Sequence, residues 1–264
     1  MSGPRPAHRG RWGPLIAKLA TEALQVSFGG HFALRDVSVS FPANRITAIV
    51  GPSGSGKTTL LRSCNRMDDD LPGCRIRGRV LLDGEDVRRP GLDLRDLRRR
   101  VAMVFQRPNP FPMSVFDNVA YGLRVRGARD RLELRRAVQA ALQEVGLWPD
   151  ARVPMGAFAL DLTPGSRQLL CIARALAVRP EVILLDEPCS LLDASATRRI
   201  ERLLADLRER YTVVIVTHSR GQAARIADHC LLLADGRAVR VGAGSEPAPT
   251  PGAGIAHGMA AGGR

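Results

Sequence analysis

The sequence predicts an α/β fold, with a mostly parallel sheet flanked by helices. Residues 182–186 (apolar up to a final Asp186) and 213–216 are typical of strands that are buried on both faces of a parallel sheet. Between them, residues 197–210 carry apolar side chains at helical spacing. A third apolar run, residues 46–50, leads into a glycine-rich loop and a helix-compatible stretch. This alternation of strands and helices indicates βαβ units.

Short β segments precede and follow this core. Apolar residues alternate with polar ones in segments of residues 24–41, which predicts an N-terminal antiparallel β-subdomain. Residues 80–84 predict a strand that ends in an Asp-Gly turn, and residues 101–105 predict another buried strand. Near the C-terminus, residues 231–241 predict a closing hairpin around Asp235-Gly236.

Residues 107–178 differ from the rest and predict a mainly helical subdomain. The segment 107–112 contains three prolines and can be neither a helix nor a central strand. Helical spacing follows over 134–145, ending at Gly146, and again over 166–178. We expect one main domain over residues 20–242. A basic, Gly- and Pro-rich stretch predicts a flexible tail over 1–19, and Gly, Ala and Pro predict a disordered tail over 243–264.

Composition excludes some classes of protein. The 264 residues contain no apolar run of the roughly 18–20 residues that a membrane span needs. The net charge of +13 comes almost entirely from arginine, which raises the possibility of nucleic-acid binding. Aromatic residues make up only 4% and the arginines are dispersed, so we expect solvated helix faces or attraction to an anionic membrane surface, and no nucleic acid. Five scattered cysteines without a C-x-x-C pair indicate reduced thiols.

The loop over residues 51–59 carries the strongest chemical signal. It matches G-x-x-x-x-G-K-[ST] between a strand and a helix, which predicts the phosphate loop of a P-loop nucleotide-binding core. Its glycines let the backbone wrap around a polyphosphate, while successive N–H groups point at the anion. Lys57 is expected to reach the β- and γ-phosphates, and Thr58 to bind Mg²⁺. The predicted nucleotide-binding residues here are Gly51, Pro52, Ser53, Gly54, Ser55, Gly56, Lys57, Thr58 and Thr59.

Four polar side chains follow predicted strands directly. Asp186 is placed to hold Mg²⁺, and Glu187 to activate the attacking water. His218 follows the strand over 213–217 and is expected to contact the γ-phosphate or the water. Gln106 follows the strand over 101–105, where an amide could sense both Mg²⁺ and the γ-phosphate. We therefore expect Glu187, His218 and Gln106 to be catalytic, and Thr58, Gln106 and Asp186 to manage the metal.

The combination resembles the ATP-binding subunits of ABC transporters. Five elements match in the family's order, and a generic P-loop ATPase does not carry them all; they are residues 51–59, Gln106, residues 184–188, residues 190–193 and His218. The resemblance covers roughly residues 20–241 and makes residues 20–242 an ABC-type ATP-binding domain. It implies a nucleotide-sandwich dimer, in which each ATP lies between one chain's phosphate loop and the other's signature segment. Asp193 belongs to the matching motif, and Phe28 falls where the family usually has an aromatic residue stacked on adenine.

Within that family, the chain looks most like the ATP-binding subunits of bacterial phosphate importers. The likeness is carried by residues 61–67, 104–112, 117–122, 170–177 and 186–189. It implies ATP hydrolysis that drives phosphate uptake at the cytoplasmic face of the bacterial membrane. Two permease subunits would be contacted through the loop after Gln106, the second ATP-binding subunit would be an identical chain, and a phosphate-binding protein would deliver the substrate.

The signature segment departs from the family's usual Leu-Ser-Gly-Gly-Gln. Here residues 162–166 read Leu-Thr-Pro-Gly-Ser. Thr163 keeps a hydroxyl and suits an N-cap, and Pro164 suits the first helical position but removes one N–H donor. Gly165 keeps its N–H, and Ser166 is shorter than glutamine. We expect Thr163, Gly165 and Ser166 to contact the partner's ATP and hydrolysis to be slowed but retained.

Other functions remain open at this point. The altered signature favours a subunit that binds ATP and dimerises but hydrolyses poorly, in a regulatory or structural role. An importer of another solute, such as polar amino acids, is a further alternative, because the ATP-binding subunit does not touch the cargo. A DNA-directed ABC-type ATPase fits poorly, because 264 residues leave no room for a coiled-coil or zinc insertion.

Overall fold

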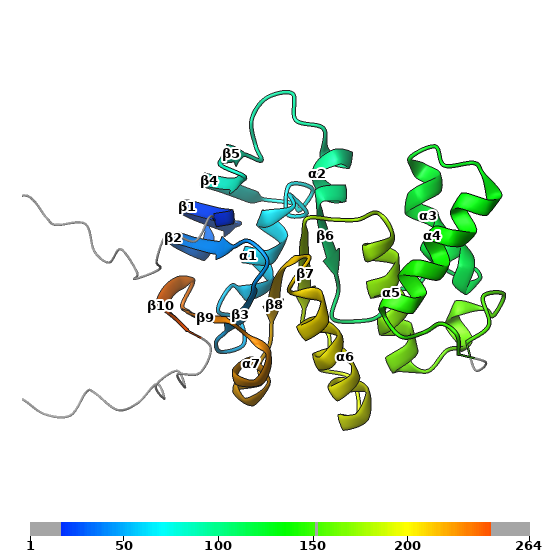
Figure 1. The fold of residues 1–264 in the computed structure, drawn as a ribbon. Helices are drawn as coiled ribbons and strands as arrows, with labels where there is room; N and C mark the ends of the chain where they lie inside the picture. Colours follow the sequence, from blue (N-terminus) through cyan, green and yellow to red (C-terminus); the bar gives the residue numbers. More distant parts are fainter. Residues whose placement is uncertain (1–16, 151–152, 244–264) are drawn as a thin grey trace, which may run out of the picture.

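The computed structural model describes residues 17–150 and 153–243, and its fold has two sheets (Figure 1). The first sheet is antiparallel with the order β2-β1-β4-β5. Its strands are β1 (Ala17–Phe28), β2 (His31–Pro42), β4 (Cys74–Leu82) and β5 (Glu85–Asp86). This confirms the predicted N-terminal antiparallel subdomain, and the Asp83-Gly84 turn joins β4 to β5 as expected.

The second sheet is mostly parallel with the order β10-β9-β3-β8-β7-β6. Its strands are β3 (Ile46–Val50), β6 (Val101–Val104), β7 (Val182–Asp186), β8 (Thr212–Val216), β9 (His229–Ala234) and β10 (Arg237–Ala243). Only β10 is antiparallel to its neighbour within the described chain, forming the predicted hairpin with β9. The α/β class predicted from sequence is therefore confirmed.

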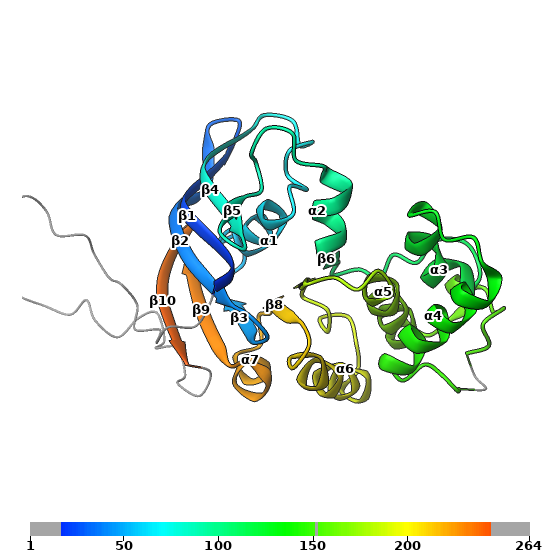
Figure 2. The ribbon, with the colours of Figure 1, turned by 45° about the horizontal axis from the view of Figure 1, so that its top comes forward.

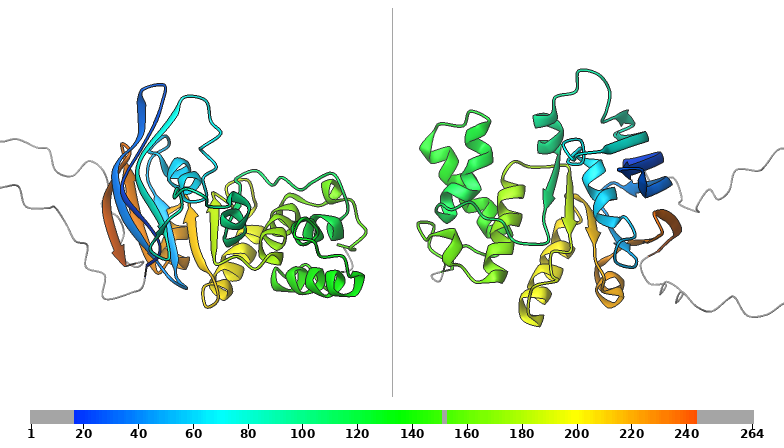
Figure 3. Two further views of the ribbon diagram at one scale, coloured as in Figure 1. Left: turned by 90° about the horizontal axis from the view of Figure 1, so that it is seen from above. Right: turned by 180° about the vertical axis from the view of Figure 1, so that it is seen from behind.

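The helices of the described chain cover the sheets and form a separate group. They are α1 (Lys57–Cys64), α2 (Leu94–Arg100), α3 (Val115–Val125), α4 (Arg131–Glu144), the 3₁₀ turn η1 (Ala159–Asp161), α5 (Pro164–Ala177), α6 (Ala194–Leu207) and α7 (Arg220–Ile226). Seen from above, α3, α4 and α5 lie at the opposite end of the molecule from the antiparallel sheet (Figures 2 and 3). None of the described helices has the length and apolar character to cross a membrane.

Burial explains why the parallel strands are apolar throughout. On β7, Ile183 and Leu185 pack into the core shared with α5 and α6, whereas Val182 and Leu184 pack into the core shared with α1 and the antiparallel sheet. All four side chains are completely buried. Since successive side chains of a strand point to opposite faces, a strand covered on both sides needs apolar residues at every position.

Several boundaries differ from the sequence predictions. β1 begins at Ala17, three residues inside the expected 1–19 tail; the rest of that tail lies outside the described residues. The expected 243–264 tail also lies outside them, apart from Ala243 at the end of β10. α5 and α6 begin at Pro164 and Ala194, before the predicted 166 and 197, because Thr163 and Asp193 cap them.

Candidate functional site

The phosphate loop connects β3 to α1 and depends on two glycines for its shape. Gly51 and Gly56 have positive φ angles of 155° and 97°. A Cβ at Gly51 would lie 2.0 Å from the Leu233 carbonyl oxygen, and one at Gly56 would lie 2.4 Å from that of Ala33. The backbones of β9 and β2 therefore hold the loop so closely that only glycine fits at these positions.

Lys57 and Thr58 start α1 and point back to the loop and the neighbouring strand. The Lys57 ammonium donates hydrogen bonds to the Gly51 and Pro52 carbonyls at 3.0 and 2.6 Å. Burial lowers the pKa of Lys57, while the Glu187 and Asp186 carboxylates oppose that shift. A cation is thus held against the concave side of the loop, where it can serve an anionic ligand.

Thr58 lies against Asp186 at the carboxyl end of β7. Its Oγ1 donates a hydrogen bond to Asp186 Oδ1 at 3.0 Å. Burial raises the pKa of Asp186, and the hydrogen bond from Thr58 opposes that shift, as do the charges of Arg62 and Lys57. The structure therefore brings together a hydroxyl and a partly desolvated carboxylate, two groups that the sequence assigned to one metal.

Glu187 is held between two other predicted residues. Gln106 Nε2 donates to Glu187 Oε2 at 3.2 Å, and His218 Nε2 lies 2.5 Å from Glu187 Oε1. The backbone of Glu187 is left-handed, with φ of 46°, and its N–H donates to the Val216 carbonyl on β8 at 3.0 Å. Such a conformation is uncommon for a non-glycine residue and persists where its surroundings enforce it, often at active sites.

A cleft opens beside Glu187 and His218 and contains residues that the sequence reasoning did not assign. Ser190 accepts a hydrogen bond from Gln106 Nε2 at 3.2 Å and donates one to the Glu187 carbonyl at 3.1 Å. Ser190 opens the matching element over residues 190–193, but no role of its own was predicted for it. The other residues that line this cleft are Cys189, Thr197, Thr217, Ser219, Gln222 and Arg225.

The signature segment starts α5 as its residue types predict. Thr163 is the N-cap, its Oγ1 accepts from the Ser166 N–H at 3.3 Å, and Pro164 occupies the first turn. The structure does not place this segment beside the phosphate loop of the same chain. α1 packs on β2, β7 and β8, whereas α5 packs on α3, α4, α6 and β6. Contact between the signature segment and ATP therefore needs a second copy, and the roles of Thr163 and Ser166 stay predictions.

Gly165 and Asp193 sit where α5 meets α6. Asp193 caps α6 by accepting a hydrogen bond from the Ala196 N–H at 2.8 Å. A Cβ at Gly165 would lie 2.9 Å from Ala196 Cβ, so the two helix starts touch. Leu191, two residues before Asp193, is a large apolar side chain that is 57% exposed. A local packing need thus explains Gly165 independently of any ligand.

Phe28 ends β1 and is half-buried. It pairs with His31 across the β1–β2 turn and packs at the edge of the core around α1. The structure shows no interaction between Phe28 and the phosphate loop, so its contact with adenine stays a prediction.

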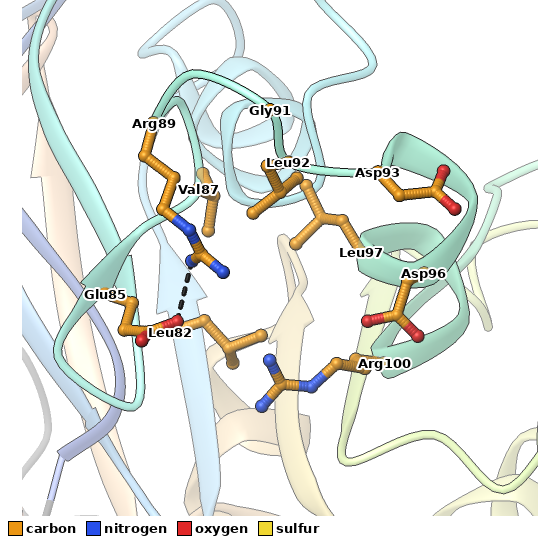
Figure 4. A pocket seen from close by; sticks show the side chains of 10 residues that line it. All are labelled: Leu82, Glu85, Val87, Arg89, Gly91, Leu92, Asp93, Asp96, Leu97 and Arg100. Carbon is orange, nitrogen blue, oxygen red and sulfur yellow. Dashed lines mark ion pairs between the residues drawn. The ribbon is translucent and has the colours of Figure 1, made fainter.

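A second pocket lies between β4, β5 and α2, away from every predicted site residue (Figure 4). Its charged side chains are already paired with protein groups. Arg89 bonds Glu85 at 2.7 Å, and Arg100 bonds Asp83 and Glu181 at 2.6 and 2.7 Å. We assign this pocket to the packing of the antiparallel sheet on α2.

The residues present fit a magnesium–nucleotide complex. The first N–H groups of α1 have no partner inside the helix, and buried Ser55 Oγ makes no hydrogen bond within the described chain, so donors remain for phosphate oxygens. The described residues contain no cluster of three or more His, Cys, Asp or Glu that could hold a metal. A site with few protein ligands suits Mg²⁺, which usually binds one or two carboxylates together with phosphates and water. Gln106 bonds Glu187 and Ser190, so its metal role stays a prediction.

Comparison with known proteins identifies an ABC transporter family match over residues 34–190. The phosphate import ATP-binding protein PstB of Thermotoga maritima is 50% identical over 221 residues, which cover 84% of this chain and 88% of that protein. The phosphate import ATP-binding protein PstB 2 of Listeria monocytogenes is 44% identical over 232 residues, which cover 88% of this chain and 86% of that protein.

Solved structures agree with this match. The cbiO1 protein of Clostridium perfringens, part of the ABC transporter complex cbiONQ, superimposes with a TM-score of 0.76 at 27% identity and covers 86% of this chain and 89% of its own. The dimeric ATP-binding cassette MJ0796, bound to ADP and Pi, superimposes with a TM-score of 0.73 at 30% identity. The match covers 85% of this chain and 98% of that chain. The chain belongs to the ABC transporter family, and within it to the phosphate import ATP-binding proteins.

Proposed function

We propose that the chain is the ATP-binding subunit of a phosphate importer and hydrolyses ATP to drive uptake of inorganic phosphate. The observation that carries this function is the Glu187 carboxylate held between Gln106 and His218, next to the Thr58–Asp186 pair. The relatives named as phosphate import proteins support phosphate as the cargo. The subunit would lie at the cytoplasmic face of the bacterial membrane.

Each residue of the site then has a separate task. The phosphate loop and Lys57 bind the polyphosphate through N–H groups and one ammonium. Bound Mg²⁺, held by Thr58 and Asp186, would neutralise developing charge on phosphoryl oxygens. Glu187 accepts a proton from the attacking water, and His218 orients that carboxylate and the terminal phosphate. Gln106 links this chemistry to the loop after it.

The site is complete only when two copies meet. Thr163, Gly165 and Ser166 would contact ATP that is bound by the phosphate loop of an identical partner chain, because α5 packs away from α1 within one chain. The loop over residues 107–112 would contact two membrane permease subunits. A phosphate-binding protein would act indirectly, by delivering phosphate to the permeases.

A specific observation also supports a weaker hydrolase. Pro164 occupies the first turn of α5, where it removes an N–H donor from the end of the helix that would face the partner's γ-phosphate. In this second candidate function, the subunit binds ATP and dimerises but turns over slowly, with a regulatory role.

A Glu187→Gln variant tests the hydrolytic role. We expect it to bind magnesium-ATP, to abolish steady-state ATPase activity and to accumulate as an ATP-bound dimer in gel filtration. Glu209→Gln, on an exposed glutamate, is the matched control and should behave as wild type. An unchanged rate and unchanged dimerisation in Glu187→Gln would contradict the role given to Glu187. A wild type that already accumulates as a dimer with little turnover would support the second candidate.

A further inference from the structure

Gln222 on α7 is a buried amide that joins three segments around the site. Its side chain is only 4% exposed. Gln222 Oε1 accepts a hydrogen bond from Thr217 Oγ1 at 2.7 Å, and Nε2 donates one to Glu201 Oε1 at 3.3 Å. Cys189 lines the same cleft, where burial raises the pKa of its thiol and the neighbouring Gln222 side chain opposes that shift. One amide thus contacts the segment before His218, the segment after Glu187 and helix α6.

The chemistry of these partners fixes the orientation of the amide. A carboxylate can only accept hydrogen bonds, so the nitrogen must face Glu201 and the oxygen must face the Thr217 hydroxyl. The second N–H is then available to the sulfur of Cys189. Both hydrogen-bonding partners of Gln222 are therefore matched in direction, which a hydrophobic or charged replacement of Gln222 alone cannot reproduce.

The position of His218 depends on its neighbours more than on its own contacts. Its side chain is 47% exposed, and its one polar contact in the described chain is Glu187. Thr217 Oγ1, which donates to Gln222, also accepts from the Ser219 N–H at 3.1 Å. The two residues that flank His218 are thus joined through a single hydroxyl, and Gln222 holds that hydroxyl.

Glu201 gives the network a fixed end on α6. It is 8% exposed, and it accepts hydrogen bonds from Arg225 Nη2 at 2.6 Å and Nε at 3.1 Å besides the one from Gln222. A buried carboxylate with several charged and neutral donors is a rigid group, because any displacement leaves a charge without compensation. α6 begins at the Asp193 cap, so the network connects the Glu187–His218 pair to the helix that follows residues 190–193.

We propose that Gln222 is a positioning residue for ATP hydrolysis, which holds the Glu187 and His218 segments in register against Glu201. The inference rests on the proposed roles of Glu187 and His218 and deepens them. Gln222 has no hydrogen bond to residues 51–59 within the described chain, so its loss should leave ATP binding intact. It should reduce turnover, because small displacements of reacting groups cost as much as 100-fold in rate.

A reciprocal exchange between Gln222 and Glu201 tests the proposal. Gln222→Glu places two carboxylates against each other, and Glu201→Gln removes the negative charge that pairs with Arg225. In the double variant the pair is restored with reversed direction, because an amide at 201 can donate to a carboxylate at 222. Arg225, three residues further along α7, can also pair with that carboxylate. The measurements are kcat, the KM for magnesium-ATP and the melting temperature of the full-length chain.

We expect each single variant to lower kcat about 10- to 100-fold with KM changed less than about 3-fold, and the double variant to recover kcat to within about 3-fold of wild type. Gln143→Leu, on an exposed glutamine of α4, is the control for loss of an amide. Single variants that melt earlier but keep wild-type kcat would overturn the proposal. So would a folded double variant that stays as slow as the singles. A wild-type chain without ATPase activity would instead contradict the proposed function itself.

Discussion

Individual residues set the chemistry of this subunit, and two of them adopt left-handed backbone conformations. Glu187 has φ of 46°, and Gly56 has φ of 97° at the start of α1. Left-handed backbone costs a non-glycine residue about 1–2 kcal/mol, so Glu187 is held there by its surroundings, including the hydrogen bond to Val216. Gly56 carries no such cost but leaves no room for a side chain.

Gly54 and Gly56 of the phosphate loop allow a controlled test of the close packing around Gly56. Gly54 and Gly56 both have positive φ, but a Cβ at Gly54 would meet no atom within 4 Å, whereas one at Gly56 would lie 2.4 Å from the Ala33 oxygen. Gly54→Ala should lower the free energy of unfolding by about 1–2 kcal/mol. Gly56→Ala should cost clearly more and abolish ATP binding, as urea denaturation without nucleotide and ATP titration would measure. Equal losses in the two variants would contradict the close packing of Gly56 against β2.

Pro164 provides a second prediction at the scale of one residue. A lost charge-assisted hydrogen bond costs about 1.5–3 kcal/mol, which corresponds to about a 10- to 100-fold slower step if it falls on the transition state. The Thr163→Ser, Pro164→Gly double variant restores the usual family residues at both positions and should raise the steady-state ATPase rate by up to that factor. Thr163→Ser alone, which keeps the hydroxyl, is the control. A double variant no faster than wild type would remove Pro164 as a limit on turnover.

Much of the candidate site could be predicted from the sequence, because its residues lie at strand ends. Asp186, Glu187 and His218 follow apolar runs that could only be central parallel strands, and such ends meet at one edge of a sheet. The contact of Gln106 with Glu187 follows from the same rule. Gln222 could not be predicted, because one of its hydrogen-bond partners, Glu201, lies 21 residues away in sequence and only the packing of α7 against α6 brings the two together.

Strands with an unbroken apolar run were predicted well, whereas helices of about two turns were missed. The strands over Ile46–Val50 and Val182–Asp186 have the predicted bounds, since full burial demands an unbroken apolar run. α2 and α7 were not predicted, because seven residues contain too few turns to show a helical period. Both begin at a side-chain cap, Asp93 and Ser219, which was the signal that could have revealed them.

Ion pairs around Glu181 connect the two sheets and make the stability of the fold depend on pH. Glu181 precedes β7 and bonds Arg100 at the end of α2 and Lys18 on β1. The hydrogen bond from Arg100 and the contact with Lys18 lower the pKa of Glu181 to about 2, although burial opposes this. Because the folded pKa is depressed, this stabilisation is present above the unfolded value of 4.5 and is lost as the pH falls toward 2.

A Glu181→Gln variant should therefore be less stable at pH 7, by about 1 kcal/mol, a modest value because the side chain is a third exposed. Its free energy of unfolding should also fall less steeply than that of wild type between pH 4.5 and pH 2. Urea denaturation at several pH values measures both effects. Asp206→Asn, exposed on α6, is the control and should retain the wild-type slope. A Glu181→Gln variant whose free energy of unfolding falls with pH as steeply as that of wild type would contradict the role given to the ion pairs of Glu181 with Arg100 and Lys18.

In the whole molecule, the phosphate loop that would bind ATP lies apart from the signature segment that would complete the site. α1, which follows the phosphate loop, packs on strands of both sheets, whereas the start of α5 belongs to the helical group with α3 and α4 (Figure 2). α5 belongs to the core on one face of the parallel sheet, whereas α1 belongs to the core on the other face, which the antiparallel sheet shares. Hydrolysis would therefore require two copies to close on ATP, and that closure is the motion available to drive a permease.

The most direct test of this account is uptake of radioactive phosphate by proteoliposomes that contain the subunit together with its two permease partners and are supplied with the phosphate-binding protein. Magnesium-ATP should drive uptake with the wild-type chain and fail to do so with Glu187→Gln, although both chains bind ATP equally. Unchanged uptake with Glu187→Gln would contradict the proposed function. So would a wild-type complex that hydrolyses ATP without moving phosphate.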